Sequence, residues 1–121
     1  IRLQSGRTVD WCEREELAQL TAKKVADEAR KGNPLALQIY ETSAAYLGKG
    51  LAMVIDILNP ELIVIGGIYT RNEDLMSPMM LKIIEQEALS LSNAVCKIRP
   101  AALGEQIGDY AALSIAANLT V

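Results

Sequence analysis

The chain has 121 residues, of which half are apolar and 22% are charged, and its formal net charge is −3 at pH 7. This length and composition are typical of one globular domain and exclude a disordered tail. The isoelectric point of about 4.9 gives no electrostatic basis for nucleic-acid contact through this segment. Because the chain contains no histidine, it has no histidine metal site and no triad or dyad that uses histidine.

The apolar runs are too short to cross a membrane. The longest, residues 51–58 and 62–68, fall well below the ~20 apolar residues that a transmembrane helix needs. Residues 1–10 contain no apolar core and therefore do not match a signal peptide. We expect a cytoplasmic protein with no membrane partner, in which Cys12 and Cys96 stay reduced.

The first predicted helix begins near a capping pattern. Asp10 and Glu13 form a D-x-x-E capping box, and apolar residues then recur at helical spacing. We expect one helix from here to about Lys31, ended by Gly32.

A second, longer helix is predicted to start directly afterwards and to end near Leu58. Asn33 is its expected N-cap and Pro34 its first helical residue. Gly48 and Gly50 inside a strongly periodic helix suggest close packing against another backbone. Seven positions form a continuous apolar stripe: Tyr40, Ala44, Leu47, Leu51, Val54, Ile55 and Leu58.

The centre of the chain predicts a buried strand. Asn59-Pro60 stops the long helix, and residues 62–65 form a short β-branched run that is typical of a parallel strand. Gly66 and Gly67 end this strand.

The last third predicts a helix, a strand and another helix. Asn72 and Ser77 offer two starts for the third helix, and residues 95–99 form a second short strand. A glycine-containing loop follows, and Asp109 is the expected cap of an alanine-rich helix that runs to about Leu119.

The resulting order is α-α-β-α-β-α, which indicates a parallel sheet and an α/β fold. Two strands make a poor sheet, because strands of this kind are normally buried on both faces and paired along their edges. We infer that further strands of the same gene product, or a second copy of the chain, complete the sheet.

Two glycine-containing segments are candidates for ligand contact. Gly66 and Gly67 lie at the carboxyl end of a strand, where ligands of open α/β sheets bind. Taken alone, such a pair is more simply explained by a tight turn that needs positive φ. They match neither the dinucleotide fingerprint nor a Walker loop. Gly104 and residues 108–113 put small residues at the start of a helix, which favours either close approach of another element or a core-packed helix.

Asp56 lies among apolar residues and therefore invites a catalytic interpretation. Helical spacing places it on one face with Lys49 and Ala52, away from the apolar stripe. This position favours a solvated carboxylate or one at the edge of a packing contact.

The order of these segments resembles the C-terminal part of the ROK family of sugar kinases and sugar-responsive repressors. The likeness covers about residues 14–119. It runs through residues 47–52 (Leu-Gly-Lys-Gly-Leu-Ala), residues 59–67, and residues 100–105 ahead of the alanine-rich helix.

The resemblance implies a lobe of the two-lobed actin/hexokinase-like (ribonuclease H-like) fold, with ATP, Mg²⁺ and a hexose in the cleft between lobes. It implies that Gly66 and Gly67, with the adjoining Ile68, lie beside the adenosine of ATP as cofactor-binding residues. It also implies that Ala111 and Ala112 pack at the hinge between lobes. Where the family often has a third small residue, Ile68 is followed by Tyr69, which would narrow or reshape the nucleotide pocket.

Other parts of the family pattern are missing from the sequence. It has no D-x-G-x-T phosphate loop, no aspartate of the kind that acts as base for the sugar hydroxyl, and no histidine for the family's structural zinc. We therefore assign no catalytic and no metal-binding residue. The chain starts at Ile1 rather than Met, and we expect residues 1–121 to be one domain, a C-terminal fragment of a longer two-lobed protein.

Three functional hypotheses follow. The first is the nucleotide-side portion of a ROK-type ATP-dependent sugar kinase, which transfers phosphoryl from ATP to a hexose and is inactive as an isolated chain. The alternative is the effector-sensing and dimerisation half of a ROK-type transcriptional repressor. The third is a stand-alone interaction domain that completes its sheet by dimerising. The expected partners are the missing N-terminal lobe, a hexose in the full protein, and a second copy in a homodimer.

Overall fold

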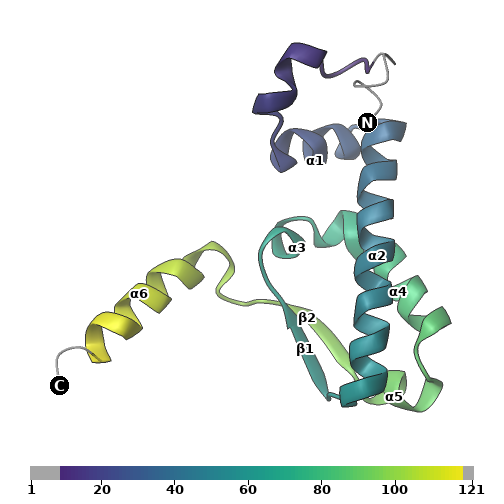
Figure 1. Ribbon diagram of the computed structural model, residues 1–121, viewed down its shortest axis with the longest axis vertical. Coiled ribbons are helices and arrows are strands. Elements are labelled where there is room, and N and C mark those ends of the chain that lie inside the picture. The colour runs from purple at the N-terminus through teal and green to yellow at the C-terminus, as the bar shows by residue number, and fades with distance from the viewer. Residues whose placement is uncertain (1–8, 119–121) are drawn as a thin grey trace.

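The computed structural model describes residues 9–118 as a helix-rich α/β arrangement (Figure 1). The long helix α2 runs along the molecule with α4 beside it, and the small sheet lies against them. The elements in chain order are the 3-10 helix η1 (Arg14–Gln19), α1 (Ala22–Arg30), α2 (Pro34–Leu58), β1 (Leu62–Ile65), α3 (Ile68–Arg71), α4 (Glu73–Glu87), α5 (Ser90–Val95), β2 (Lys97–Pro100), the 3-10 helix η2 (Gly104–Gln106) and α6 (Ile107–Asn118).

The sheet consists of β1 and β2, which pair in parallel with Leu62 opposite Lys97 and Ile65 opposite Pro100. The predicted parallel pairing is confirmed. One face of the sheet packs on the helical core, whereas Leu62 and Val64 on the other face are more than half exposed. The two strands are therefore half-buried rather than buried on both faces, because α2 and α4 cover only one side.

The core lies between α2 and α4. The largest fully buried side chains are Ile55 from α2 and Met80 and Ile84 from α4. Burial of such side chains supplies ~1.5–3 kcal/mol each, so this contact contributes several kcal/mol to the stability of the fold. Tyr40 and Ala44, two members of the predicted stripe, are also buried here.

Gly48 allows this close packing. A Cβ at this position would lie 2.8 Å from the carbonyl oxygen of Met80 and 2.9 Å from the Cβ of Ile83. The prediction of close backbone packing is thus confirmed for Gly48. It is wrong for Gly50, which has open space where a Cβ would lie, because this residue turns away from α4.

The bounds of α2 agree with the sequence analysis. The Oδ1 atom of Asn33 accepts hydrogen bonds from the backbone N–H groups of Leu35 and Ala36, and Asn59 ends the helix in a left-handed conformation with φ of 46°. The predicted apolar stripe is wider than the covered side of the helix. Val54 and Leu58 are therefore exposed, by 39% and 69%.

The prediction of one helix from Asp10 to about Lys31 is wrong. The chain forms η1 and then α1, whose N-cap is Thr21, because the Thr21 Oγ1 accepts a hydrogen bond from the backbone N–H of Lys24. The carboxylate of Asp10 accepts hydrogen bonds from Asn33 Nδ2 at 3.2 Å instead of capping a helix.

The predicted third helix begins at the first of its two predicted starts, Asn72, but it is split into two helices, α4 and α5. A short α3 precedes α4, and α4 begins at Glu73 because the carbonyl of Asn72 accepts from the two N–H groups of Leu75 and Met76. The second predicted start, at Ser77-Pro78, lies inside α4. The second piece, α5, extends into the start of the predicted second strand, so β2 begins two residues later than predicted.

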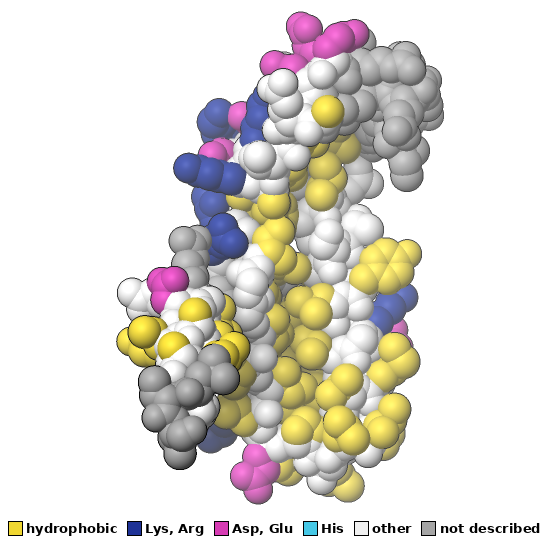
Figure 2. Space-filling view, turned by 60° about the vertical axis from the view of Figure 1, so that its left-hand side comes forward, with side chains coloured by type: hydrophobic (Ala, Val, Ile, Leu, Met, Phe, Trp, Pro, Cys, Tyr) yellow, Lys and Arg dark blue, Asp and Glu magenta, His cyan; other side chains and the backbone are white. Residues whose placement is uncertain are grey.

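The last helix extends away from the rest of the molecule (Figure 1). It begins at Ile107, so Asp109 lies inside its first turn rather than at its cap, and its predicted end at Leu119 falls outside the described residues. All of α6 is exposed, including Ala111 and Ala112. Figure 2 shows the hydrophobic side chains gathered over the lower part of the molecule, and the exposed set includes Ile57, Leu62, Val64, Leu113 and Ile115.

Among residues 9–118, no helix has both the length and the apolar character that crossing a membrane requires.

The two glycines of α2 form a matched pair for mutation. We expect Gly48→Ala to lower the free energy of unfolding by about 1 kcal/mol, because the added methyl displaces a backbone carbonyl and this exceeds the gain in helix propensity. Gly50→Ala should raise it by about 0.5–1 kcal/mol, since that position is open. Urea unfolding followed by circular dichroism measures both, and equal effects would contradict the assignment of Gly48 to the contact.

Candidate functional site

A depression lies where both parallel strands end. It encloses about 430 Å³ and joins the segments after β1 and β2, which are the two glycine-containing segments singled out in the sequence. Gly67 and Gly104 both adopt positive φ, at 65° and 52°, and neither has a neighbour within 4 Å of the place where a Cβ would lie. The backbone is therefore open to a ligand at both positions. The lining residues are Gly67, Thr70, Arg71, Gly104 and Ile107.

The two strand ends are tied together at Ile65. Its carbonyl oxygen accepts a hydrogen bond from the backbone N–H of Ala101 at 2.9 Å and another from Thr70 Oγ1 at 3.3 Å. Gly66 lies beside Ala101, whose Cβ would be 3.9 Å from a Cβ at Gly66. These contacts fix the exit of both strands and hence the position of the depression.

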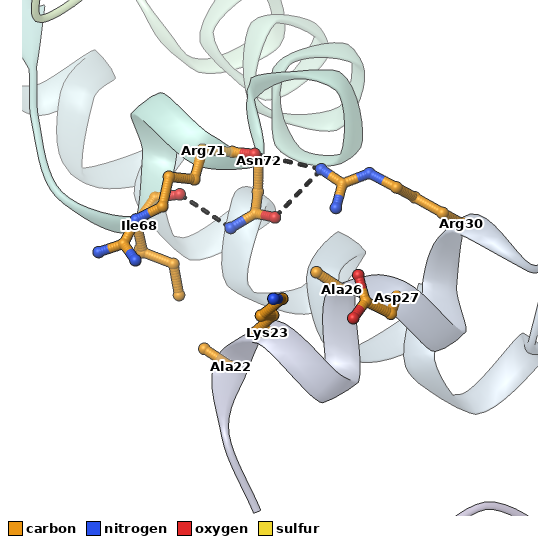
Figure 3. Close-up of a pocket in the computed structure, with 8 residues that line it drawn as sticks. All are labelled: Ala22, Lys23, Ala26, Asp27, Arg30, Ile68, Arg71 and Asn72. Carbon is orange, nitrogen blue, oxygen red and sulfur yellow. Dashed lines mark hydrogen bonds between the residues drawn. The ribbon is translucent and has the colours of Figure 1, made fainter. Parts of the chain in front are cut away.

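A second depression, of about 400 Å³, lies between α1 and the segment around α3 (Figure 3). Arg71 lines both depressions, so the turn from Gly67 to Arg71 separates them. The lining residues are Ala22, Lys23, Ala26, Asp27, Arg30, Ile68, Arg71 and Asn72.

Arg30 bridges this second depression. Its Nε and Nη2 atoms each donate to one carboxylate oxygen of Asp74 at 2.9 Å, a bidentate pair. The Nη2 atom also donates to the carbonyl oxygen of Arg71 at 3.1 Å and to Asn72 Oδ1 at 3.3 Å. Figure 3 shows the guanidinium reaching from α1 to the start of α4.

The ion pair shifts both ionisations. The hydrogen bond from Arg30 lowers the pKa of the Asp74 carboxyl below its ordinary value, and the same bond raises the pKa of Arg30. Asp74 remains 56% exposed, so solvent screens the pair. The pair therefore fixes the position of α1 relative to the start of α4 and adds little to the free energy of unfolding.

The predicted cofactor-binding residues occupy different places. Gly67 lines the depression at the strand ends, and Ile68 lines the one between α1 and α3. Gly66 is among the lining residues of neither. The assignment of these three residues to a nucleotide stays a prediction.

Sequence reasoning missed the polar residues around these glycines. Thr70 and Arg71 lie within four residues of Gly67 and had a positional signal, because they belong to the segment that leaves the strand end. Arg30 had none, since it lies more than 40 positions from the residues that it contacts. The interpretation of Asp56 as a carboxylate at a packing edge is confirmed, because its Oδ1 accepts from the backbone N–H of Leu89 at 2.9 Å.

Within residues 9–118, no three His, Cys, Asp or Glu side chains come together in a group that would hold a metal ion.

A parallel strand pair with paired helices on one face and glycines at the carboxyl ends defines a helix-rich α/β protein with a candidate ligand site at the strand ends. The sequence profile of the ROK family matches residues 2–118, and the chain belongs to this family. The expected family is thus confirmed over nearly the whole chain.

Curated relatives include regulators and kinases. The chain is 34% identical over 73 residues to the DNA-binding transcriptional dual regulator NagC of Escherichia coli, covering 60% of this chain and 18% of that protein. It is 35% identical over 89 residues to a glucokinase of Halalkalibacterium halodurans, covering 74% of this chain and 27% of that protein. The chain thus matches only 18% of the length of the first of these relatives and 27% of the second.

A solved structure shares the fold. It is the crystal structure of a ROK family transcriptional regulator, a homologue of the E. coli MLC protein, with a TM-score of 0.68 and 25% sequence identity. The match covers 82% of this chain and 24% of that chain. The arrangement of helices and strands is therefore one that a ROK protein adopts.

The Arg30–Asp74 pair predicts a pH dependence of stability. Because the folded-state pKa of Asp74 is lowered, the pair's contribution is complete above about pH 5 and is lost as the pH falls below the ordinary value of 3.8. We expect Asp74→Asn to lower the free energy of unfolding at pH 7 by less than about 1 kcal/mol, and to reduce its decline between pH 5 and pH 3. Urea unfolding at several pH values measures this, and an unchanged decline would contradict the pair.

Proposed function

We propose that the chain forms the nucleotide-side portion of a ROK-type ATP-dependent sugar kinase. The observation that carries this proposal is the depression at the carboxyl ends of β1 and β2, which Gly67 and Gly104 both line. Ligands of open α/β sheets bind at this end of the strands. The volume of about 430 Å³ falls in the range of small-molecule sites.

The residues present suit a flat ligand that lies against backbone. The open space at Gly67 and Gly104 lets a nucleoside approach the main chain without a clash with a side chain. In this proposal Gly67 lies against the adenosine inside the depression, while Gly66 and Ile68 adjoin Gly67 in the chain and border the adenosine from outside that lining. Thr70 fixes the turn through its hydrogen bond to the carbonyl oxygen of Ile65. ATP, with the Mg²⁺ bound to its phosphates, would supply the phosphoryl group for transfer to the hexose.

The remaining parts of the reaction are assigned to the rest of the protein. Phosphoryl transfer requires positioned phosphates and a base near the acceptor hydroxyl. In this proposal an N-terminal lobe of the same cytoplasmic protein supplies them, together with the hexose site, in a two-lobed actin/hexokinase-like fold. The uncovered side of the sheet and the exposed α6 are surfaces for that lobe and for a homodimer partner.

The alternative proposal is the effector-sensing and dimerisation half of a ROK-type repressor. The likeness to NagC and to the ROK regulator structure favours it. The coding sequence upstream of Ile1 distinguishes the two. A D-x-G-x-T loop followed by a sugar site would support the kinase, whereas a helix-turn-helix would support the repressor.

Nucleotide binding tests the depression directly. We expect Mg·ATP to bind the chain and to shift the amide resonances of Gly67 and Gly104 in a titration followed by NMR. Gly67→Ala should weaken binding by about tenfold, or about 1.4 kcal/mol, because the new side chain enters the depression and strains the backbone.

The matched control is Gly32→Ala. Gly32 also has positive φ, at 87°, and open space around it, but it lies at the end of α1, outside both depressions. The Gly32→Ala variant should unfold more easily than the wild type but bind Mg·ATP with the same affinity. Failure of the wild-type chain to bind millimolar Mg·ATP would count against the nucleotide site, and equal weakening by both substitutions would count against its location.

The isolated chain is expected to show no kinase turnover. It contains neither a phosphate loop nor a base for the sugar hydroxyl, so bound ATP would have no positioned acceptor. A coupled assay for ADP release, with glucose, N-acetylmannosamine and fructose as acceptors, measures this. Sugar-dependent turnover by the pure chain would contradict the proposal that the N-terminal lobe supplies the base and the hexose site.

A further inference from the structure

The turn that separates the two depressions is held by side chains from outside it. Residues 67–72 lead from β1 into α4 and contribute Gly67, Thr70 and Arg71 to one depression and Ile68, Arg71 and Asn72 to the other. The helical part of this turn, α3, is only four residues long. A helix this short is not stable by itself, so its conformation depends on contacts made by its neighbours.

Asn72 is one of these contacts. It is only 6% exposed, and it is the buried polar side chain of the described core. Its Nδ2 donates to the carbonyl oxygen of Ile68 at 3.0 Å, across the length of α3, and its backbone N–H donates to the carbonyl oxygen of Tyr69. The side chain thus closes the turn on itself.

Arg30 fixes the same turn from α1. Its Nη2 donates both to the carbonyl oxygen of Arg71 and to the Oδ1 of Asn72. The two carboxylate oxygens of Asp74 fix the orientation of the guanidinium by accepting from its Nε and Nη2 atoms. A planar guanidinium can make the bidentate pair with a carboxylate and still donate to two further oxygens, which a lysine ammonium in the same place would not reproduce. When Arg30 holds the Oδ1 atom of the Asn72 amide, the Nδ2 atom of the same amide points toward the carbonyl oxygen of Ile68 (Figure 3). Asn72 therefore links Arg30 to Ile68 through two consecutive hydrogen bonds.

We propose that Arg30 and Asn72 are positioning residues, which set the conformation of residues 67–72 and thereby the wall shared by the two depressions. Arg30 joins α1 to this wall, so the placement of α1 determines the shape of the site at the ends of the strands. The consequence for ligand affinity rests on the proposed nucleotide function, whereas the effect on the turn does not.

The first experiment uses the ligand-free protein. Amide spectra are compared for wild type, Arg30→Met, Arg30→Lys and the control Lys31→Met, at a temperature where circular dichroism shows every variant folded. Lys31 is the next residue along the chain, and its ion pair with Glu28 at 2.7 Å stays within α1. The control therefore removes one positive charge from the same place without touching the turn.

We expect Arg30→Met to shift the amide resonances of residues 67–72 and Lys31→Met to leave them unchanged. Arg30→Lys should restore them in part, because an ammonium group reaches Asp74 but does not make the forked contact to Arg71 and Asn72. Asn72→Ala should shift the same resonances, since it frees the carbonyl of Ile68. Resonances of residues 67–72 that stay unchanged in Arg30→Met would overturn the proposal, as would an equal shift in Lys31→Met.

The second experiment measures Mg·ATP affinity by calorimetry on the same variants. We expect about tenfold weaker binding for Arg30→Met, an intermediate loss for Arg30→Lys, and wild-type affinity for Lys31→Met. Equal weakening by Arg30→Met and Lys31→Met would show a general effect of charge and would contradict positioning. If wild type binds no Mg·ATP, the proposed function fails, and the amide comparison decides the role of Arg30 by itself.

Discussion

The close contact of α2 with α4 at Gly48 determines where the rest of the structure lies. Because Gly48 has no side chain, the carbonyl of Met80 and the Cβ of Ile83 approach α2 to a distance that a methyl group would not allow. β1 follows α2, and α4 lies between β1 and β2 in the chain, so fixing this pair of helices places both strands against one side of it. The parallel order and the common edge of the strand ends follow from this packing.

That common edge creates the candidate site. Segments more than 35 residues apart meet there, because Gly67 follows β1 and Gly104 follows β2. The carbonyl of Ile65 joins them through Ala101 and Thr70. The depression is therefore a consequence of strand pairing, and its two glycines keep the backbone open where the chain must turn with positive φ.

Membership of the ROK family places this chain among proteins named as sugar repressors and as glucokinases. A shared fold of this kind does not decide between sensing and phosphoryl transfer, because function depends on the site rather than on the scaffold. In this chain the candidate site is an open depression lined by Gly67 and Gly104, and Arg30 holds the adjoining turn through its hydrogen bonds to Arg71 and Asn72. Such a depression would bind the nucleotide in a kinase, whereas in a repressor it would form part of the effector-sensing half.

Local sequence determined the well-capped and periodic elements: Asn33-Pro34 and Asn59 bounded α2, and the β-branched run before Gly66 set β1. These signals act within a few residues, so they survive without knowledge of the fold. The start of α1 at Thr21 is a local signal of the same kind, because the Thr21 Oγ1 accepts a hydrogen bond from the backbone N–H of Lys24. Tertiary structure alone decided that Gly48 and not Gly50 faces α4 and that Arg30 contacts the turn before α4. Those outcomes depend on which surfaces meet across 30 or more residues, and no local pattern encodes that meeting.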